Sequence, residues 1–209
     1  MKKVSLILII LGGFSFVTYA QTVTIGTQVW MTKNLNVDKF RNGDPIPHAK
    51  TKKEWKNAVG NGQPAWCYYN NDPANGLKYG RLYNWYAVND PRGLAPIGWH
   101  IPNDEEWTVL ENYLGDEAGK KMKTKYGWKA VDEDMGGVSG DNESGFSALP
   151  AGGFSGNEFY EQGSSTYYWS LSKKYPNVWL YYWFGNLQKW ENDNNDDFES
   201  GYSVRCIKD

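Results

Sequence analysis

The sequence predicts an α+β domain. Strand-like segments lie near both ends of the chain, at residues 22–25, 28–31 and 202–207, and a strong helix signal lies between them at 103–114. Strands, then helices, then strands again is the order typical of an α+β fold. The 209 residues suit a single domain, since a domain takes roughly 100–200 residues.

Composition narrows the class of protein. Aromatic residues make up 16% of the chain, with 11 Trp, 15 Tyr and 23 Gly, and the mean hydropathy is −0.67. This excludes a polytopic membrane protein, a coiled coil and a collagen, and it argues against disorder. With 22 basic and 24 acidic residues, the chain has no basic excess, so we expect no nucleic-acid partner.

The first twenty residues have the three-part pattern of a secretory signal peptide. A basic start at residues 2–3 precedes an apolar run at 4–16, and small residues then lead to Gln21. The apolar run is too short to span a bilayer, which takes about 20 residues. We therefore expect a signal peptide at 1–20, a mature domain at 21–209, and no membrane association after its removal. The expected location is periplasmic, cell-surface or secreted.

The helix at 103–114 has the clearest signals. Asn103 is a capping residue, Glu106 follows at the third helical position, and Gly115 ends the segment. Apolar residues recur at three- and four-residue spacing and form one stripe: Trp107, Leu110, Tyr113 and Leu114.

Weaker patterns indicate further elements. Thr51 and Glu54 form a capping-box pattern for a helix reaching about Ala58, and a second helix is expected at 117–125, with its lysines on a solvated face. Strands are expected at 66–69, 146–149, 166–171 and 178–184.

Few residues suit metal or nucleophilic chemistry. Export would place Cys67 and Cys206 in an oxidising compartment, where they can pair. Two buried free thiols are the alternative, and the sequence leaves both open. The only histidines are His48 and His100, and His100, just before the helix start, is interpreted as a structural residue.

Catalytic motifs are mostly absent. The chain has no Gly-x-Ser-x-Gly elbow and no phosphate-binding loop. A glycosidase needs two facing carboxylates, which a sequence alone does not reveal. A non-catalytic role is favoured, and an enzyme stays open.

An acidic run at 191–197 is the strongest candidate for an ion site. Calcium prefers six to eight oxygen ligands, and Asp193, Asp196 and Asp197 supply carboxylates within a short loop. The run does not fit an EF-hand, because Phe198 stands where the loop glycine belongs if Asp193 opens the loop. A solvent-exposed hairpin tip is the alternative. Calcium is the one cofactor that the sequence suggests.

Aromatic side chains crowd the last third of the chain. Neighbouring residues of a strand point to opposite faces, so rings at 167–169 and 179–184 would occupy both faces. One face can be core, while the other would leave rings open for a sugar or a protein. A two-layer core that covers both faces is the alternative. The candidate ligand contacts are Trp179, Tyr181, Trp183 and Trp190.

Several phrases together resemble a known family. They are Tyr-Gly-Arg-Leu-Tyr-Asn-Trp-Tyr-Ala-Val at 79–88, Gly-Leu-Ala-Pro-Ile-Gly-Trp-His-Ile-Pro at 93–102, Glu-Ser-Gly-Phe-Ser-Ala-Leu-Pro-Ala-Gly-Gly at 143–153 and Gly-Tyr-Ser-Val-Arg-Cys at 201–206. This pattern is similar to the Fibrobacter succinogenes major paralogous domain, common in exported proteins of Bacteroidetes.

The resemblance implies a C-type lectin-like, or formylglycine-generating-enzyme-like, fold. In it two helices flank small antiparallel sheets, a long irregular loop region follows, and the two end strands lie together. No catalytic residues carry over. Many members have Cys where Ala95 stands, so the family's cysteine pattern is incomplete here; if Cys206 pairs with that position in the family, it is unpartnered in this chain or pairs with Cys67.

Taken together, these observations predict an exported, non-catalytic binding domain that recognises a glycan or a surface protein. A polysaccharide-active enzyme and a structural or adhesive envelope component are the alternatives. The sequence gives no indication of oligomeric state.

Overall fold

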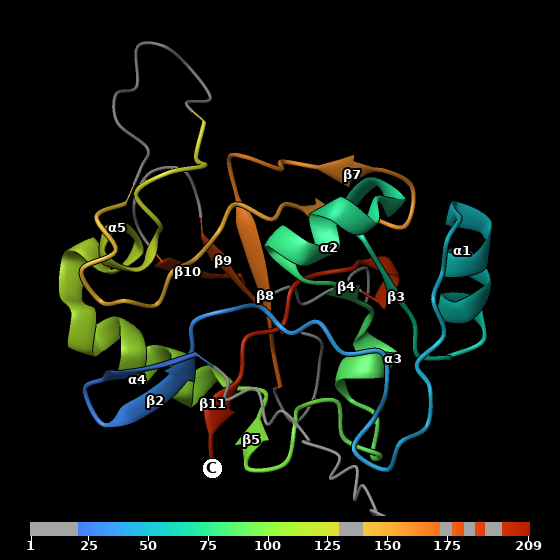
Figure 1. Ribbon diagram of the computed structural model, residues 1–209, viewed down its shortest axis with the longest axis horizontal. Coiled ribbons are helices and arrows are strands. Elements are labelled where there is room, and N and C mark those ends of the chain that lie inside the picture. The colour runs from blue at the N-terminus through green and yellow to red at the C-terminus, as the bar shows by residue number, and fades with distance from the viewer. Residues whose placement is uncertain (1–20, 130–139, 172–176, 182–186, 191–197) are drawn as a thin grey trace, which may run out of the picture.

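Short helices and small antiparallel sheets make up the computed structural model of the protein (Figure 1). It describes residues 21–129, 140–171, 177–181, 187–190 and 198–209. The mixed architecture agrees with the predicted α+β class. No helix in these ranges is long and apolar enough to cross a bilayer.

The described ranges hold more helices than the two that the resemblance implied. The helices are α1 (Lys52–Gly60), α2 (Pro73–Tyr79), α3 (Trp85–Val88), α4 (Asp104–Leu114) and α5 (Ala118–Met122), with 3₁₀ turns η1 (Tyr69–Asn71) and η2 (Gly115–Glu117). The strands are β1 (Thr22–Ile25), β2 (Gln28–Met31), β3 (Trp66–Cys67), β4 (Leu82–Tyr83), β5 (Trp99–His100), β6 (Gly153–Phe154), β7 (Phe159–Tyr160), β8 (Thr166–Ser170), β9 (Asn177–Tyr181), β10 (Leu187–Trp190) and β11 (Ile207–Lys208).

The two ends of the domain meet in the four-stranded sheet, whose order is β1-β2-β11-β5. Ile207 pairs with Trp30 on one side and His100 on the other, both antiparallel. The remaining sheets are β10-β9-β8, β3-β4 and β6-β7. The expectation that the end strands lie together is therefore confirmed.

Both helices predicted from capping signals are present. In α1 the Thr51 side chain accepts from the Glu54 backbone N–H, and Glu54 accepts from Thr51 in return. Asn103 and Glu106 make the same reciprocal pair before α4, at 3.0 and 2.9 Å. Each pair satisfies backbone N–H groups that a helix start leaves free.

The apolar stripe of α4 is one residue narrower than predicted. Trp107, Leu110 and Leu114 are buried, but Tyr113 is 64% exposed. At about 100° per residue, Tyr113 lies about 120° around the helix from Trp107, which is the edge of the buried face. Because of this position, the Tyr113 ring lines the cleft described below instead of packing in the core.

The helix predicted at 117–125 is shorter than expected. The α5 helix ends at Met122, and Lys123 takes an extended conformation that pairs it with Ala148. Lys123 is 1% exposed, so the predicted solvated lysine face is wrong at this residue. Lys123 pairs with Ala148 in a β-bridge instead of continuing the helix by another turn.

The strand predicted at 202–207 forms only in part. Regular pairing is confined to β11 at its end, and residues 200–207 are all buried. Single bridges hold the rest: Tyr202 to Tyr83 and Ser203 to Tyr168. The segment threads between other elements, so neither face is left for solvent.

Two further strand predictions need correction. Residues 146–149 form only an isolated bridge at Ala148, because Ser147 has φ +60 and breaks the extended conformation. Of the strand expected at 66–69, only the first two residues form a strand, β3, because the 3₁₀ turn η1 begins at Tyr69. The strands at 22–25, 28–31 and 166–170 are confirmed.

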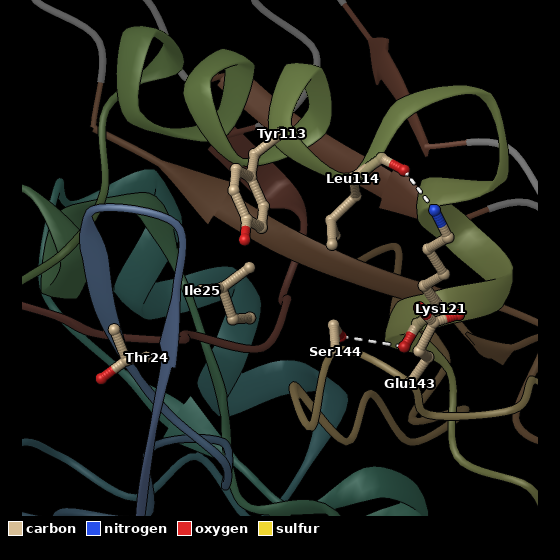
Figure 2. Close-up of a pocket in the computed structure, with 7 residues that line it drawn as sticks. All are labelled: Thr24, Ile25, Tyr113, Leu114, Lys121, Glu143 and Ser144. Carbon is tan, nitrogen blue, oxygen red and sulfur yellow. Dashed lines mark hydrogen bonds between the residues drawn. The ribbon is translucent and has the colours of Figure 1, made fainter.

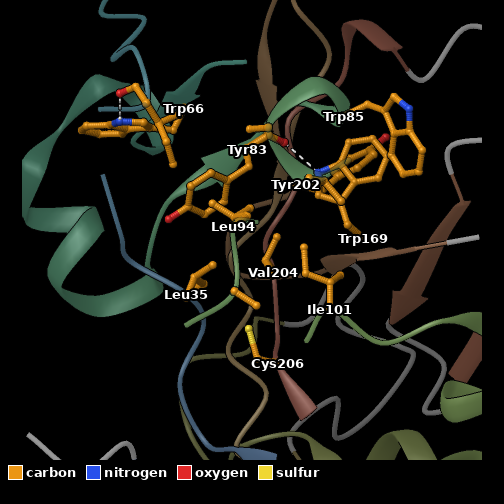
Figure 3. Close-up of a cluster of buried hydrophobic side chains, with 14 of the residues drawn as sticks. Leu35, Trp66, Tyr83, Trp85, Leu94, Ile101, Trp169, Tyr202, Val204 and Cys206 are labelled. Atoms are coloured by element: carbon orange, nitrogen blue, oxygen red, sulfur yellow. Dashed lines mark hydrogen bonds between the residues drawn. The ribbon is translucent and has the colours of Figure 1, made fainter. Parts of the chain in front are cut away.

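Aromatic rings fill the core, which Figure 3 shows at its largest cluster. There Trp169 Nε1 donates to the Tyr83 carbonyl at 2.7 Å, so a buried indole N–H has a partner. A second cluster packs α4 and α5 against the β1–β2 hairpin, where the ring centroids of Trp30 and Trp107 lie 4.9 Å apart. Fully burying a side chain such as Leu110 contributes about 1.5–3 kcal/mol.

Strand β8 settles one open alternative for its own residues. Tyr167, Tyr168 and Trp169 are all buried, so both faces of β8 belong to the core. The two-layer core is therefore correct at β8, and these rings are not a ligand surface.

The cysteines are free thiols, and both are buried. Cys206 belongs to the central cluster, whereas Cys67 packs in a separate cluster with Trp55 of α1. Of the two alternatives that the sequence left open, the structure has the free thiols.

Candidate functional site

Three of the four ligand contacts predicted from the sequence lie in strands of the three-stranded sheet. Trp179 and Tyr181 are in β9, paired with Lys189 and Leu187, and Trp190 is in β10, paired with Val178. The register does not make Trp179 and Trp190 partners. Trp183 lies outside the described residues.

The predicted calcium ligands Asp193, Asp196 and Asp197 also lie outside the described residues. Within the ranges that are described, no three His, Cys, Asp or Glu side chains are grouped so as to hold a metal ion. The calcium site stays a prediction.

A cleft of about 350 Å³ lies between α4, α5 and the β1–β2 hairpin (Figure 2). Its lining comes from four separate parts of the chain. The lining residues are Thr24, Ile25, Tyr113, Leu114, Lys121, Glu143 and Ser144.

The ring of Tyr113 forms one wall of the cleft and points from α4 toward the hairpin. It packs against the turn at Gly26, which has φ +59. A Cβ at Gly26 would lie 2.9 Å from Tyr113 Cδ2. Only glycine both adopts this φ readily and leaves room for the ring. The ring is thus supported on one side while it stays largely open to solvent.

The opposite wall is held by hydrogen bonds to backbone groups. Lys121 Nζ donates to the Leu114 carbonyl at 2.7 Å, close to the C-terminal end of α4. Ser144 Oγ donates to the Lys121 carbonyl at 2.9 Å (Figure 2). The lysine neutralises a helix end that carries partial negative charge. These bonds fix the spacing between α4, α5 and the loop at 143–144.

Glu143 supplies the one carboxylate of the lining. Its backbone N–H donates to Asp141 Oδ1 at 2.9 Å, which holds the loop in shape. Among the described residues, the Glu143 carboxylate has no hydrogen-bond or ion-pair partner, and the residue is exposed. A free acceptor therefore faces a cleft that already offers a ring, hydroxyls and an ammonium group.

This arrangement suits binding better than hydrolysis. Ligand clefts combine an apolar surface with a few placed polar groups, and this one has both. Glycoside hydrolysis takes two carboxylates flanking the scissile bond, and the cleft lining has only Glu143.

His100 lies apart from the cleft, between two carboxylates. Its Nε2 is 2.7 Å from Glu106 Oε1, and its Nδ1 is 2.8 Å from Asp209 Oδ1. Partial burial lowers the pKa of His100, but the hydrogen bonds to Glu106 and Asp209 outweigh it and the pKa is raised. Both ring nitrogens are engaged, so His100 of β5 is tied to α4 through Glu106 and to the residue after β11 through Asp209, as a structural role requires.

The cleft residues were missed in the sequence for a physical reason. Tyr113 was assigned to the buried stripe, and Glu143 is separated from it by 29 intervening residues in the sequence. The one available signal was angular: Tyr113 is the stripe member farthest from Trp107 around the helix.

Comparison with known proteins gives a family and nothing closer. No curated protein and no solved structure matches the chain. The family model described as the Fibrobacter succinogenes major domain matches residues 23–208. This match covers nearly the whole described fold, from β1 to β11. The chain therefore belongs to the Fibrobacter succinogenes major domain family.

Proposed function

We propose that this chain is an exported, non-catalytic binding domain that takes a glycan in the cleft between α4 and the β1–β2 hairpin. The observation that carries the proposal is that Tyr113, 64% exposed, lines the same cleft as Glu143, whose exposed carboxylate has no hydrogen-bond or ion-pair partner among the described residues. Sugar rings present apolar C–H faces that stack on aromatic rings, and their hydroxyls donate to carboxylates. The export signal in residues 1–20 and the resemblance to C-type lectin-like folds support the same function.

The cleft chemistry favours a neutral glycan. Lys121 already donates to the Leu114 carbonyl at 2.7 Å, so its ammonium is partly committed, whereas Glu143 is free to accept. A ligand with hydroxyl donors at the Glu143 end and a C–H face at the Tyr113 end uses both. The Glu143 carboxylate would repel the charged group of an anionic ligand.

The test is glycan-array screening of the purified protein, followed by calorimetric titration of the best neutral oligosaccharide. Tyr113→Ala should weaken binding about tenfold, equivalent to about 1.4 kcal/mol, and Tyr113→Phe should keep most of it because the ring remains. The matched control is Tyr126→Ala, which removes another exposed ring, 83% exposed, outside the cleft lining.

Glu143→Gln should also weaken binding, because a neutral amide is a poorer acceptor than a carboxylate. Glu158→Gln, at another exposed glutamate, is its control. Binding that ignores Tyr113 and Glu143 but is lost in Trp179→Ala would move the site to the β9 rings predicted from the sequence. Absence of binding across the array would reject glycan recognition and favour a surface protein as the partner.

A further inference from the structure

A second cleft, of about 400 Å³, lies on a different part of the molecule and shares no residue with the first. It forms where the segment after β2 meets α2 and the loop segments around Thr124 and Ser147. Its lining residues are Gln21, Thr32, Lys33, Asn34, Asn36, Gly76, Leu77, Lys78, Gly80, Thr124, Ser147 and Leu149.

The charge of this lining is one-sided. Lys33 and Lys78 have its only ionisable side chains, and no Asp or Glu belongs to it. Both lysines are exposed. Lys78 Nζ lies over the Tyr79 ring at 4.7 Å; within the described ranges neither ammonium has a hydrogen-bond or salt-bridge partner. The cleft therefore presents two uncompensated positive charges beside amide and hydroxyl groups.

The wall between the segment after β2 and α2 is held rigidly. Asn34 Nδ2 donates to the Tyr79 carbonyl at 2.9 Å, and Asn36 Nδ2 donates to the Gly76 carbonyl at 3.1 Å. Gly80 has φ +80, and a Cβ there would lie 2.8 Å from the Leu35 carbonyl oxygen. The close approach of the two segments requires glycine, so the backbone positions of Lys33 and Lys78 are fixed relative to each other.

Ser147 adds a strained backbone to the same lining. It has φ +60, which residues other than glycine rarely adopt. Asn142 holds it from both sides: Ser147 N–H donates to Asn142 Oδ1 at 2.8 Å, and Asn142 Nδ2 donates to Ser147 Oγ at 3.0 Å. Strained residues that their surroundings hold in place cluster at ligand sites.

The cleft also has apolar surface. Leu77 is 90% exposed on α2, and Leu149 lies partly exposed across the cleft. An inorganic ion would use the lysines and leave this surface unused. A ligand with a carbon skeleton uses both.

We propose that this second cleft binds an anionic sugar, that is, a saccharide unit carrying a carboxylate or a sulfate ester. The anionic group lies between Lys33 and Lys78. The sugar hydroxyls contact the side chains of Asn36, Thr124 and Ser147, and the sugar ring covers Leu77. This site is distinct from the glycan cleft beside α4 and does not depend on it.

The test is calorimetric titration of the purified protein at low salt with four probes: glucuronate, N-acetylglucosamine 6-sulfate, glucose and inorganic sulfate. At least one of the two anionic sugars should bind, and the better one identifies the anionic group. Its affinity should fall as salt is added, because exposed charges are screened. Binding of glucose or inorganic sulfate as tight as that of the anionic sugars would overturn the proposal, as would no binding of either anionic sugar at millimolar concentration.

The double variant Lys33→Gln, Lys78→Gln should lower the affinity at least tenfold, while Lys33→Arg, Lys78→Arg should retain it. Lys53→Gln removes an exposed lysine of α1 and should change nothing. Wild-type affinity in the double Gln variant overturns the proposal. Tyr113→Ala should leave this titration unchanged, so failure of the glycan cleft and failure of this site are distinguishable.

Discussion

Asn34 Oδ1 accepts two hydrogen bonds from the guanidinium of Arg205, one from Nε at 3.2 Å and one from Nη2 at 2.7 Å. Arg205 is fully buried. Its other N–H groups donate to the Met31 and Phe146 carbonyls and to the Tyr168 hydroxyl. All five donors of the side chain are thereby used. One buried cation thus joins the start, the middle and the end of the domain through neutral acceptors.

Replacing Arg205 with Lys should destabilise the protein by about 3 kcal/mol or more. Lysine keeps the charge but has three donors in place of five, so buried acceptors lose their partners at about 1–3 kcal/mol each. Urea unfolding gives the free energy. Lys208→Gln, at an exposed neighbour in β11, should change it by less than about 0.5 kcal/mol. A small loss in Arg205→Lys would show that water replaces the missing donors.

His100 should contribute stability on the acidic side. Its folded-state pKa is raised above the ordinary value of 6.5, so the contribution is complete below that value and is lost as pH rises through the folded pKa. His100→Gln should therefore cost up to about 1 kcal/mol at acidic pH, given the partial exposure of the pair, and little at alkaline pH. Urea unfolding at both pH values measures the difference.

The pKa of His48 is shifted in the direction opposite to that of His100, so the two histidines should affect stability in acid in opposite ways. It stacks on Trp66 with ring centroids 3.8 Å apart, and burial, followed by nearby Lys50 and Arg81, lowers its pKa. The unfolded chain then takes up the proton first as pH falls, so His48 destabilises the folded state in acid. The pH slope of stability should move in opposite directions in His48→Gln and His100→Gln; equal slopes would contradict both assignments.

Local signals explain why some elements were predictable. The helices α1 and α4 begin with capping boxes at Thr51 and Asn103, which involve residues only three apart. Such signals depend little on the rest of the fold. Strands β4 to β7 have two residues each, too few to show a period, and only β3, of the same length, was predicted, as part of the apolar and aromatic run at 66–69.

Tertiary structure explains what was not predictable. The segment 202–207 is buried on both sides, because Val204 and Cys206 pack in the central cluster while Arg205 contacts other core elements. Each cleft likewise combines residues far apart in sequence, such as Tyr113 with Glu143 and Lys33 with Lys78. Composition predicted exposed aromatic rings and acidic groups as the binding chemistry, which stays a prediction, and it could not indicate where in the fold they would lie.

Gly152 should be among the least replaceable glycines of the chain. It has φ +67, and a Cβ there would lie 2.3 Å from the Tyr160 carbonyl oxygen and 2.7 Å from the Gln162 nitrogen. Gly43 has φ +90 but nothing within 4 Å, so it matches the backbone strain without the clash. Gly43→Ala should cost about 1–2 kcal/mol and Gly152→Ala at least about 2 kcal/mol more. Thermal and urea unfolding measure the loss of stability in each variant. Equal losses would mean that the β6–β7 hairpin shifts at little cost to make room for the Cβ.

The thiols should be unreactive in the folded protein and reactive after unfolding. Burial raises the pKa of Cys67, and it raises that of Cys206 to about 12. The reactive thiolate is therefore scarce at neutral pH, and both groups are covered. Alkylation without reductant should add nothing to the native protein and two adducts in denaturant, as read by mass.

Single variants separate this outcome from a disulfide. Cys67→Ala should give one adduct in denaturant, as free thiols require. If wild type gave no adduct in denaturant while Cys67→Ala gave one, the two cysteines would be paired. Reductant should leave the melting temperature of wild type unchanged.

Calcium at Asp193, Asp196 and Asp197 is open to a direct thermal test. A ligand that binds only the folded state stabilises it by about 2.7 kcal/mol at a hundredfold excess over its dissociation constant. For a domain of this size that shifts the melting temperature by several degrees. Melts in calcium and in chelator should differ by this amount, magnesium should give less because it requires octahedral geometry, and Asp196→Asn with Asp197→Asn should abolish the shift. The control is Glu158→Gln, which removes an exposed carboxylate elsewhere in the chain. Identical melts would mean that the acidic run is a solvated hairpin tip, and a shift that survives in the double variant would place the ion elsewhere.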